Sequence, residues 1–427
     1  MSVQHVANYP IIRKLGEGAT SEVFLCQDPF RNRQVAVKRI FPESLRDPTR
    51  GRLFRKLFFT EASLAGKLEH PHIAQIYDAG IGEDSGYIVM EYVPGGNIER
   101  FCAPATLLPV EQTVEIIFKC ARALSYAHMQ GVTHRDIKPG NLLYAAAPTD
   151  VRIGDFGLAL NVGTDTTQIT GVGSPAYMSP EQIREEVVDH RTDIYSLGVV
   201  MYQMLSGKLP FQGSNKFSMI YQITQFDPAP PSAHRPEVPE SLDRIVRRAM
   251  HKEVKSRYHS GDELAEELVQ ALRSGLGAGR REAFGDADKF AALRAMQFFK
   301  PFADPELWEV VRFGDWQRVS AGTELVREGE PGEFFCLLIE GEARVTKNRK
   351  LVTVLGPGEC FGEMAYLAAE RGQRGATVTA SKDAHTVRVR TADLEQASVN
   401  CRSHFDRAFI GILVERLNLA NTRLTSG

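Results

Sequence analysis

The sequence contains few cysteines, and nothing in their spacing would pair them. Six cysteines are scattered over 427 residues, and no two of them form a CxxC motif. Such a pattern fits reduced thiols in a cytoplasmic protein better than a disulfide framework or a zinc site. An apolar run of membrane-spanning length is also lacking, because IYSLGVVMYQML is too short and fits a buried helix.

Two further absences restrict the expected partners. The N-terminal segment MSVQHVANYPIIRKLGEG has no signal-peptide core, which again indicates the cytoplasm. The net charge is −2, from 51 basic and 53 acidic residues, and gives no general attraction to nucleic acid or to an anionic membrane. Too few residues follow Cys401 for a DNA-reading helix-turn-helix. We therefore expect neither nucleic acid nor membrane as a partner.

The residues that are present indicate an α+β protein of more than one domain. A chain of 427 residues is too long for one ordinary core. Strand-like segments such as VFLCQD and VAVKRIF come first, and helical periodicity follows up to residue 272. Residues 273–297 begin Gly-rich and charged and end with a helical pattern, which predicts a linker. Residues 298–420 alternate short strands with glycine turns before a helical tail, which predicts a small β-barrel or jelly roll.

Short motifs in residues 9–272 carry phosphate chemistry. In LGEGATSEV, Gly16 and Gly18 would let backbone amides approach phosphate oxygens. VAVK places Lys38 on a strand. THRDIKPGN gathers two charged groups, Asp136 and Lys138, with an amide in one loop, and DFG follows further along the chain. The glycine loop alone is weak and THRDIKPGN is much more specific, and the order and spacing of all four motifs point to phosphoryl transfer.

These motifs resemble those of the eukaryotic-type serine/threonine protein kinases, over residues 9–272. KPGN after HRD is typical of serine/threonine rather than tyrosine specificity, and SPEQ in place of APE is similar to the bacterial branch. The resemblance implies a two-lobed kinase fold with ATP and Mg²⁺ as cofactors and Ser/Thr proteins as substrates.

The resemblance also assigns roles to residues. Lys38 would hold the α- and β-phosphates and pair with Glu61, and Asp136 would orient the substrate hydroxyl. Lys138 would neutralise the γ-phosphate, while Asn141 and Asp155 would supply oxygen ligands to Mg²⁺. Adenine would lie between Leu15, Val23, Ala36 and Leu143 and beside Met90, with backbone contacts from Glu91 and Val93. Architectural polar anchors are expected at Asp193 and in a pair formed by Arg257 and Glu181.

One departure from the kinase pattern is visible, and one regulatory feature is implied. Ser21 stands where the phosphate loop commonly has a third glycine, and it is still a small residue. Arg135 would pair with a phosphorylated activation loop. The candidate phosphorylation sites are Thr164, Thr166, Thr167 and Thr170. Ser174 is assigned an architectural role, and the alternative for the threonines is that they only solvate the loop.

The second part of the chain carries a different phosphate motif. FGEMAYLAAERGQRGATV places an acid and arginines among small residues, which suits an anion held by backbone amides and a guanidinium. With GEPGEFFCLLIEGEARV and LGPGECFGEMAYL it resembles the cyclic nucleotide-binding domain, over residues 298–420. The resemblance implies that Glu363 accepts a bond from the ribose 2′-OH and that Arg374 pairs with the cyclic phosphate. The amides near Gly362, Ala365 and Ala376 would complete the cradle.

Two departures affect the expected ligand. The segment between FGE and RGATV is longer than is usual in this family, which affects the direction in which Arg374 points. Gly375 stands where members selective for cyclic GMP carry threonine, so cyclic AMP is favoured over cyclic GMP.

Several functions remain open on the sequence alone. The leading one is an ATP-dependent serine/threonine kinase regulated in cis by a cyclic nucleotide. Alternatives are an active kinase whose second domain is only a protein-interaction module, and a pseudokinase scaffold. The linker motif RREAF, residues 280–284, has the shape of a pseudosubstrate, but Gly140 and Asn97 replace the acids that would recognise it. We therefore expect coupling through the helices flanking the barrel. A homodimer is possible.

Overall fold

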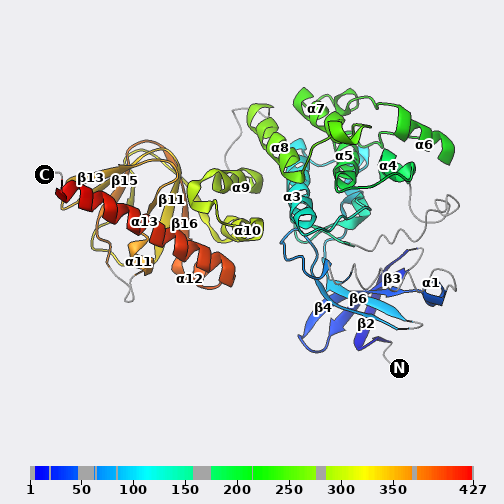
Figure 1. Ribbon diagram of the computed structural model, residues 1–427, viewed down its shortest axis with the longest axis horizontal. Helices are drawn as coiled ribbons and strands as arrows, with labels where there is room; N and C mark the ends of the chain where they lie inside the picture. The colour runs from blue at the N-terminus through cyan, green and yellow to red at the C-terminus, as the bar shows by residue number, and fades with distance from the viewer. Residues whose placement is uncertain are drawn as a thin grey trace. The chain divides into compact units, whose positions relative to one another are not determined.

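The computed structural model describes residues 5–18, 21–46, 62, 65–82, 85–156, 175–213, 215–275, 285–367 and 373–425. The chain divides into two compact units, residues 1–280 and 281–427 (Figure 1). Each unit is described separately.

The first unit begins with a six-stranded antiparallel sheet of order β1-β2-β3-β4-β6-β5. Its strands are β1 (His5–Val6), β2 (Tyr9–Glu17), β3 (Ser21–Asp28), β4 (Arg33–Ile40), β5 (Ile76–Ile81) and β6 (Gly86–Glu91), and a short helix α1 (Pro42–Arg46) follows β4. Side chains alternate between the two faces of a strand, so Val35 and Val37 of β4 pack in one cluster. Ala36 packs on the opposite face, and the same alternation puts Lys38 on the face of Ala36.

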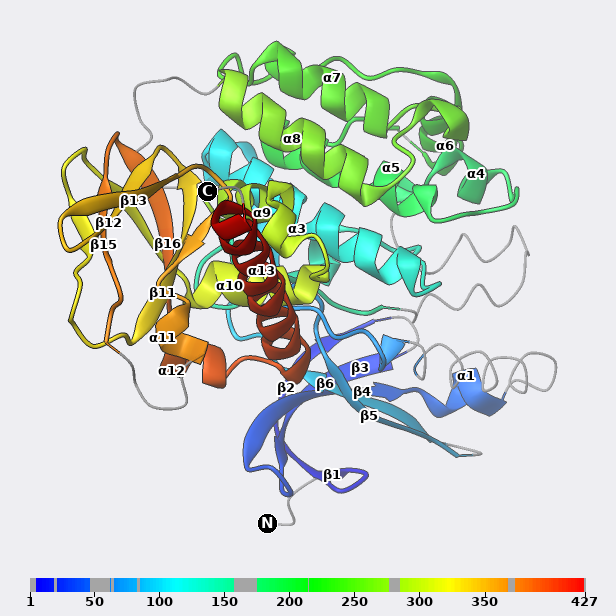
Figure 2. The same ribbon diagram turned by 60° about the vertical axis from the view of Figure 1, so that its left-hand side comes forward.

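The rest of this unit is mainly helical (Figure 2). Its α-helices are α3 (Val110–Met129), α4 (Pro180–Ile183), α5 (Arg191–Ser206), α6 (Lys216–Gln225), α7 (Glu240–Ala249) and α8 (Gly261–Gly275). Two strands, β7 (Leu142–Tyr144) and β8 (Val151–Ile153), form a small antiparallel ribbon. The short 3₁₀ helices are η1 (Ile98–Phe101), η2 (Pro104–Thr106), η3 (Pro139–Asn141), η5 (Pro175–Tyr177), η6 (Pro231–Ala233) and η7 (Val254–Ser256). The helix α5 ends at Gly207, whose φ of 72° is one that side chains disfavour.

The second unit is a β-sandwich flanked by helices. Its sheets have the orders β10-β15-β12-β13 and β14-β11-β16-β9. The strands are β9 (Asp315–Val319), β10 (Glu324–Val326), β11 (Phe334–Glu340), β12 (Ala343–Lys347), β13 (Lys350–Leu355), β14 (Cys360–Phe361), β15 (Thr377–Ala380) and β16 (Ala384–Arg390). The helices are α9 (Asp286–Ala295), η8 (Gln297–Phe299), α10 (Asp304–Phe313), α11 (Met364–Leu367), α12 (Thr391–Glu395) and α13 (Val399–Thr425).

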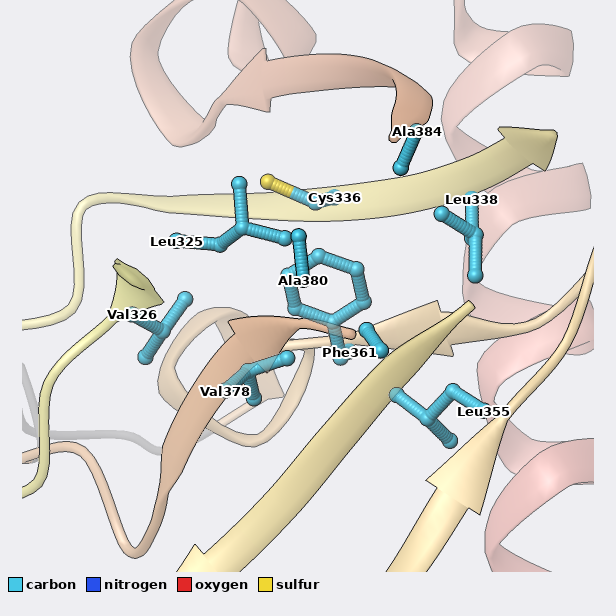
Figure 3. Close-up of a cluster of buried hydrophobic side chains, with 10 residues drawn as sticks. Leu325, Val326, Cys336, Leu338, Leu355, Phe361, Val378, Ala380 and Ala384 are labelled. Carbon is cyan, nitrogen blue, oxygen red and sulfur yellow. The ribbon is translucent and has the colours of Figure 1, made fainter. Parts of the chain in front are cut away.

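The core of the sandwich lies between its two sheets. Leu325, Leu338, Phe361 and Val378 come from four different strands and converge there (Figure 3). The edge strand β13 carries apolar side chains outside this core, because Leu351, Val352 and Val354 are all exposed.

Aromatic side chains join the flanking helices to the sandwich. Phe298 of η8 lies 5.6 Å, centroid to centroid, from Phe409 of α13. Phe409 lies 4.9 Å from Phe335 of β11 and 5.6 Å from Tyr366 of α11. One aromatic cluster thus connects the N-terminal helices of this unit with the short helix after Glu363.

The predicted fold class is confirmed: the chain has a mixed helix-and-sheet kinase unit and a second unit rich in β-structure. Within the parts of the chain that the structure describes, no helix has the length and apolar character needed to cross a membrane.

Candidate functional site

The loop that carries Asp136 is fixed by a buried carboxylate. Asp193 of α5 accepts hydrogen bonds from the backbone N–H groups of His134, at 2.8 Å, and Arg135, at 2.7 Å. His128 contacts the same carboxylate at 2.8 Å. These bonds hold Arg135 at a φ of 65°, a conformation that non-glycine residues rarely adopt. The predicted anchoring role of Asp193 is confirmed.

Asp136, Lys138 and Asn141 meet at one point, as the sequence predicts. Lys138 Nζ lies 2.7 Å from Asp136 Oδ2, and Asn141 Nδ2 donates to the same oxygen at 3.0 Å. The Asn141 amide also donates to the Asp136 carbonyl at 2.7 Å. Because Asn141 is buried and Asp136 is only half-buried, the amide orients a carboxylate that a protein hydroxyl can still reach.

Lys38 reaches across the first unit to Asp155. Its Nζ lies 3.1 Å from Asp155 Oδ1, and the two residues are 117 positions apart in the sequence. Burial opposes ionisation of Asp155, but the charge and hydrogen bond of Lys38, helped by His134 and Lys138, hold the pKa of this carboxyl below its usual value. Asp155 is therefore ionised at neutral pH.

His134 connects the two halves of this site. Its Nε2 donates to the carbonyl of Gly154 at 2.8 Å, and its Nδ1 accepts from the backbone N–H of Asp136 at 3.2 Å. The bonds define one tautomer and tie the Asp136 loop to the residue before Asp155. Sequence reasoning passed over His134 because a histidine inside HRD carries no separate signal.

The residues predicted to hold adenine lie around β3, β4, β6 and β7. Ala36 and Met90 are register partners on adjacent strands and are buried together. Leu15 and Val23 pack against the same cluster. Leu143 of β7 bridges to Asn97, after the segment that contains Val93. Ala36, Met90, Leu15 and Val23 thus give an apolar face on the side of β4 that carries Lys38, while Leu143 lies on β7.

Glu91 has a side-chain role that the sequence did not indicate. Its carboxylate lies 3.0 Å from Arg152 Nε and accepts from the Gln75 backbone N–H at 3.3 Å. The carboxylate is thus engaged elsewhere, which is consistent with the prediction that Glu91 contacts adenine through its backbone.

The described residues of the predicted phosphate loop lie at the end of β2 and the start of β3. Gly18 N–H donates to the Ser21 carbonyl at 2.7 Å. A Cβ at Gly16 would meet no atom within 4 Å, so Gly16 borders open space. Ser21 is buried, which fits a small residue at this position.

The oxygen donors of this site suit a divalent cation. Asn141 uses its NH₂ group toward Asp136, so its amide oxygen remains for a metal. Asp155 is ionised and uses Oδ1 toward Lys38, so Oδ2 remains. Ionised carboxylate and amide oxygens are the hard ligands that Mg²⁺ prefers.

Several predicted residues lie outside the described part of the chain. They are Glu61, the four threonines Thr164, Thr166, Thr167 and Thr170, and Ser174. The roles given to them stay predictions. By contrast, the predicted pairing of Arg257 with Glu181 is confirmed as two buried bonds of 2.6 and 2.7 Å.

In the second unit, Arg374 is a buried cation beside two carbonyl groups. Its side chain donates to Gly362 O at 2.9 Å and to Phe334 O at 2.6 Å, and it stacks on the Phe334 ring at 4.5 Å. Only 5% of the residue is exposed, and burial lowers the pKa of the guanidinium. No carboxylate of the described residues forms an ion pair with it. A guanidinium has five N–H groups, so donors remain for an anion.

Gly362 is required at its position for two reasons. Its φ is 84°, and a Cβ there would lie 2.7 Å from Arg374 Nη1. Any side chain would therefore displace the guanidinium.

Glu363 is almost completely buried and has a partner that the sequence did not reveal. Arg416 of α13 donates to Glu363 Oε1, and its other terminal nitrogen donates to Cys360 O at 2.8 Å. The two charged residues are 53 positions apart, and a lone arginine in an amphipathic helix gives no signal of such a pair. The Glu363 carbonyl also accepts from the backbone N–H groups of Tyr366 and Leu367, which lie in α11 (Met364–Leu367).

The remaining predicted residues surround this pair. Gly375 is exposed and Ala376 half-buried between Arg374 and β15. Ala365 is in α11, and residues 368–372, in the longer segment, lie outside the described chain. The structure thus brings Gly362, Glu363 and Arg374 together at one end of the sandwich.

Comparison with known proteins identifies both units. Residues 9–271 match the protein kinase domain family, and residues 316–400 match the cyclic nucleotide-binding domain family. The chain belongs to the protein kinase family. The predicted combination of a bacterial serine/threonine kinase domain with a C-terminal cyclic nucleotide-binding domain is confirmed.

Relatives and solved structures agree with this assignment. The serine/threonine-protein kinase PknB of Mycobacterium leprae (strain TN) is 37% identical over 287 residues, which are 65% of this chain and 45% of the relative. PknB of Mycolicibacterium smegmatis is 36% identical over 301 residues, 68% of this chain and 47% of the relative. The chain thus spans under half the length of these proteins. The crystal structure of the Mycobacterium tuberculosis PknI kinase domain has a TM-score of 0.52 at 29% identity and covers 63% of this chain and 98% of that domain.

Proposed function

We propose that this kinase transfers the γ-phosphoryl group of ATP to serine or threonine of protein substrates, under control of a cyclic nucleotide bound in the same chain. Cyclic AMP is favoured over cyclic GMP. The six cysteines are all buried and unpaired, which supports the reducing cytoplasm as its location.

The kinase part rests on the cluster of Asp136, Lys138 and Asn141 opposite the Lys38–Asp155 pair. Asp136, held by Asn141, accepts a hydrogen bond from the substrate hydroxyl and receives its proton as the new O–P bond forms. The bond from the γ-phosphorus to the bridging oxygen breaks, and ADP leaves. Lys138 compensates negative charge on the transferred group.

Positioning completes this mechanism. Bound Mg²⁺ would neutralise phosphate charge and would be held by Asn141 and Asp155. Lys38 Nζ lies 3.1 Å from Asp155 Oδ1, so Lys38 would bring a positive charge to phosphates bound beside this metal ligand. Ala36, Met90 and Leu143 would exclude water from the adenine ring.

The cyclic nucleotide part rests on one observation, the buried Arg374 without a carboxylate partner among the described residues. A desolvated cation is costly unless an anion pairs with it, and a cyclic phosphate supplies that charge. Glu363 directly follows Gly362, whose carbonyl accepts from this guanidinium. Arg416 binds Oε1 of Glu363, and Oε2 would accept from a ribose hydroxyl.

Selectivity for cyclic AMP follows from the residue after Arg374. Gly375 has no hydroxyl to offer to guanine. The nearby hydroxyl of Thr377 already accepts from the Glu328 backbone N–H at 3.0 Å. Neither residue favours guanine over adenine.

Control of the kinase would pass through the aromatic cluster. Tyr366 follows Glu363 on α11, and it contacts Phe409 of α13, which contacts Phe298 of η8. A ligand that moves Glu363 and the start of α11 would change the packing of this cluster. Because Phe298 of η8 belongs to the cluster, the change would reach α9, which lies between the linker and η8. We propose this route in place of a pseudosubstrate.

Autophosphorylation and calorimetry on the full chain test these proposals. Wild type should incorporate labelled phosphate from ATP, and Asp136→Asn should lose activity by about a thousandfold. A comparably active Asp136→Asn chain would contradict the kinase mechanism, and an inactive wild type would favour the pseudokinase scaffold.

The nucleotide site is tested with cyclic AMP and cyclic GMP. Arg374→Ala should weaken cyclic AMP binding by about 2–3 kcal/mol, while Arg344→Ala, an exposed arginine of β12, should not. If wild type binds neither nucleotide at millimolar concentration, the second unit is an interaction module and the cis regulation is wrong.

A further inference from the structure

Two arginines lie against one aromatic ring in the second unit. The guanidinium carbon of Arg374 is 4.5 Å from the centre of the Phe334 ring, and that of Arg388, on β16, is 4.4 Å from the same centre. Both distances are typical of a cation–π contact, and they place the two carbons less than about 9 Å apart. We call this pair the stacked arginines. Arg374 belongs to the proposed nucleotide site, whereas no motif of the sequence assigns a role to Arg388.

Arg388 lies on the face of β16 that is turned toward the core of the sandwich. It is the register partner of Cys336 on β11, and residues paired in this way share one face of a sheet. Cys336 belongs to the core cluster between the two sheets (Figure 3). A partly buried arginine on such a face is unfavourable unless an acid or several carbonyl groups receive its N–H groups.

The described part of the chain supplies no such partner for Arg388. Its Nε is buried and has no hydrogen-bond acceptor there, and no carboxylate there forms an ion pair with it. Asp315, its register partner on β9, accepts at Oδ2 from Gln317 Nε2 at 2.7 Å. The Cys336 thiol bonds to Arg388, but burial raises the pKa of this thiol to about 12, so it is neutral and brings no opposite charge.

The surroundings therefore leave the stacked arginines with an excess of positive charge. Glu363 does not neutralise them, because Arg416 is bonded to it. An arginine that serves only the fold is satisfied differently in this chain, since Arg257 holds both carboxylate oxygens of the buried Glu181. Arg388 has no comparable structural partner among the described residues, so its charge remains for a ligand.

We propose that Arg388 is a positioning residue of the nucleotide pocket, a second cation that holds Arg374 toward the bound phosphate and adds its own attraction for it. The proposal rests on the proposed function, because it requires an anionic nucleotide beside Arg374. In the empty pocket the two like charges repel each other across the Phe334 ring. Burial lowers the pKa of the Arg374 guanidinium, and the charge of Arg388 adds to this lowering. A phosphate anion relieves both effects.

This role has opposite consequences for stability and for binding. Arg388→Met keeps an apolar stem and a contact with the ring, but it removes the charge and the unsatisfied donor. The empty second unit should therefore unfold at a higher urea concentration than in wild type. Cyclic AMP should bind about tenfold more weakly, because the phosphate loses the attraction of a unit charge roughly 9 Å away. A residue that only supported the fold would lower the urea midpoint instead.

Calorimetry with cyclic AMP and urea unfolding, both on the full chain, test the proposal. The fluorescence of Trp308 and Trp316 reports on the second unit, which contains both tryptophans. Arg388→Lys keeps the charge and should bind cyclic AMP within about threefold of wild type. Arg344→Met, which changes an exposed arginine of β12, is the matched control and should alter neither measurement.

The results separate this proposal from the proposed function. Weaker binding by Arg388→Met, with a urea midpoint no lower than that of wild type and with binding restored in Arg388→Lys, supports it. Equal binding by wild type and Arg388→Met, or a lower urea midpoint in Arg388→Met, would overturn the role of Arg388 alone. A wild type that binds no cyclic AMP at millimolar concentration would overturn the nucleotide site and this role together.

Discussion

At the scale of single residues, Asp193 shows how burial and charge combine. Its carboxylate is fully buried and accepts two backbone N–H bonds from the loop before Asp136. Burial alone would raise its pKa, but His128, His134 and these bonds hold the pKa below the usual aspartate value. The ionised form therefore stabilises the fold. That contribution is complete above the unfolded-state pKa of about 4 and is lost as pH falls through the lower folded-state value.

We predict that Asp193→Asn lowers the stability of the kinase unit by about 2–3 kcal/mol at pH 7, because backbone donors lose a charged acceptor. The difference from wild type should shrink below about pH 4. Urea unfolding of the full chain followed by far-UV circular dichroism measures it. Trp308 and Trp316, the two tryptophans of the sequence, both lie in the second unit. Their fluorescence transition is an internal control that should not move, and a loss independent of pH would contradict the assignment.

At the scale of elements, α13 holds the candidate nucleotide pocket through Arg416. Removing this guanidinium leaves the Glu363 carboxylate buried without the arginine that holds its Oε1. A carboxylate that is no longer held in place is a poorer acceptor for a ribose hydroxyl.

We therefore expect Arg416→Met to weaken cyclic AMP binding about tenfold, or about 1.4 kcal/mol. Glu415→Gln, an exposed neighbour on α13, is the matched control and should bind as wild type does. Isothermal titration calorimetry measures both. Tighter binding in Arg416→Met would mean that Arg416 competes with the ribose instead of supporting its acceptor.

Elements whose signals are local could be predicted from sequence. The β4 strand with Lys38 and the loop with Asp136, Lys138 and Asn141 follow from motifs a few residues long. The helical tail predicted at the end of the second domain is α13, which begins at Val399.

Contacts between distant segments were not predictable in the same way. The Lys38–Asp155 bond joins residues 117 apart, and the Arg416–Glu363 pair joins residues 53 apart. Only the resemblance to a known family placed Lys38 and Asp155 in one site, and it gave no role to Arg416. Such pairs depend on how distant elements pack against each other, and hydrophobic periodicity does not reveal that packing.

At the scale of the whole molecule, regulation could act through a pseudosubstrate in the linker or through the helices that flank the sandwich. RREAF, residues 280–284, lies outside the described chain. A pseudosubstrate needs acids to receive its arginines, but Asn97 is occupied as the cap of η1, where its side chain accepts from Glu99 N–H at 3.2 Å. Gly140 has no side chain to offer.

We expect the double variant Arg280→Ala with Arg281→Ala to keep the basal kinase rate and its response to cyclic AMP, both within about twofold. Initial rates of phosphate transfer to a protein substrate, with and without nucleotide, measure this. A several-fold rise in the nucleotide-free rate would restore the pseudosubstrate.

The edge strand β13 has a consequence for handling the protein. Its unpaired edge and three exposed aliphatic side chains form a template for sheet-to-sheet aggregation. β12 and β13 form a hairpin. Lys347 and Lys350 pair beside its turn, and Arg349 lies in the turn at a φ of 62°. Such a cationic tip repels a second edge, and repulsion between exposed charges is screened within about 8 Å at physiological salt. High salt should therefore promote precipitation of this chain, and dilute buffer should keep it dispersed.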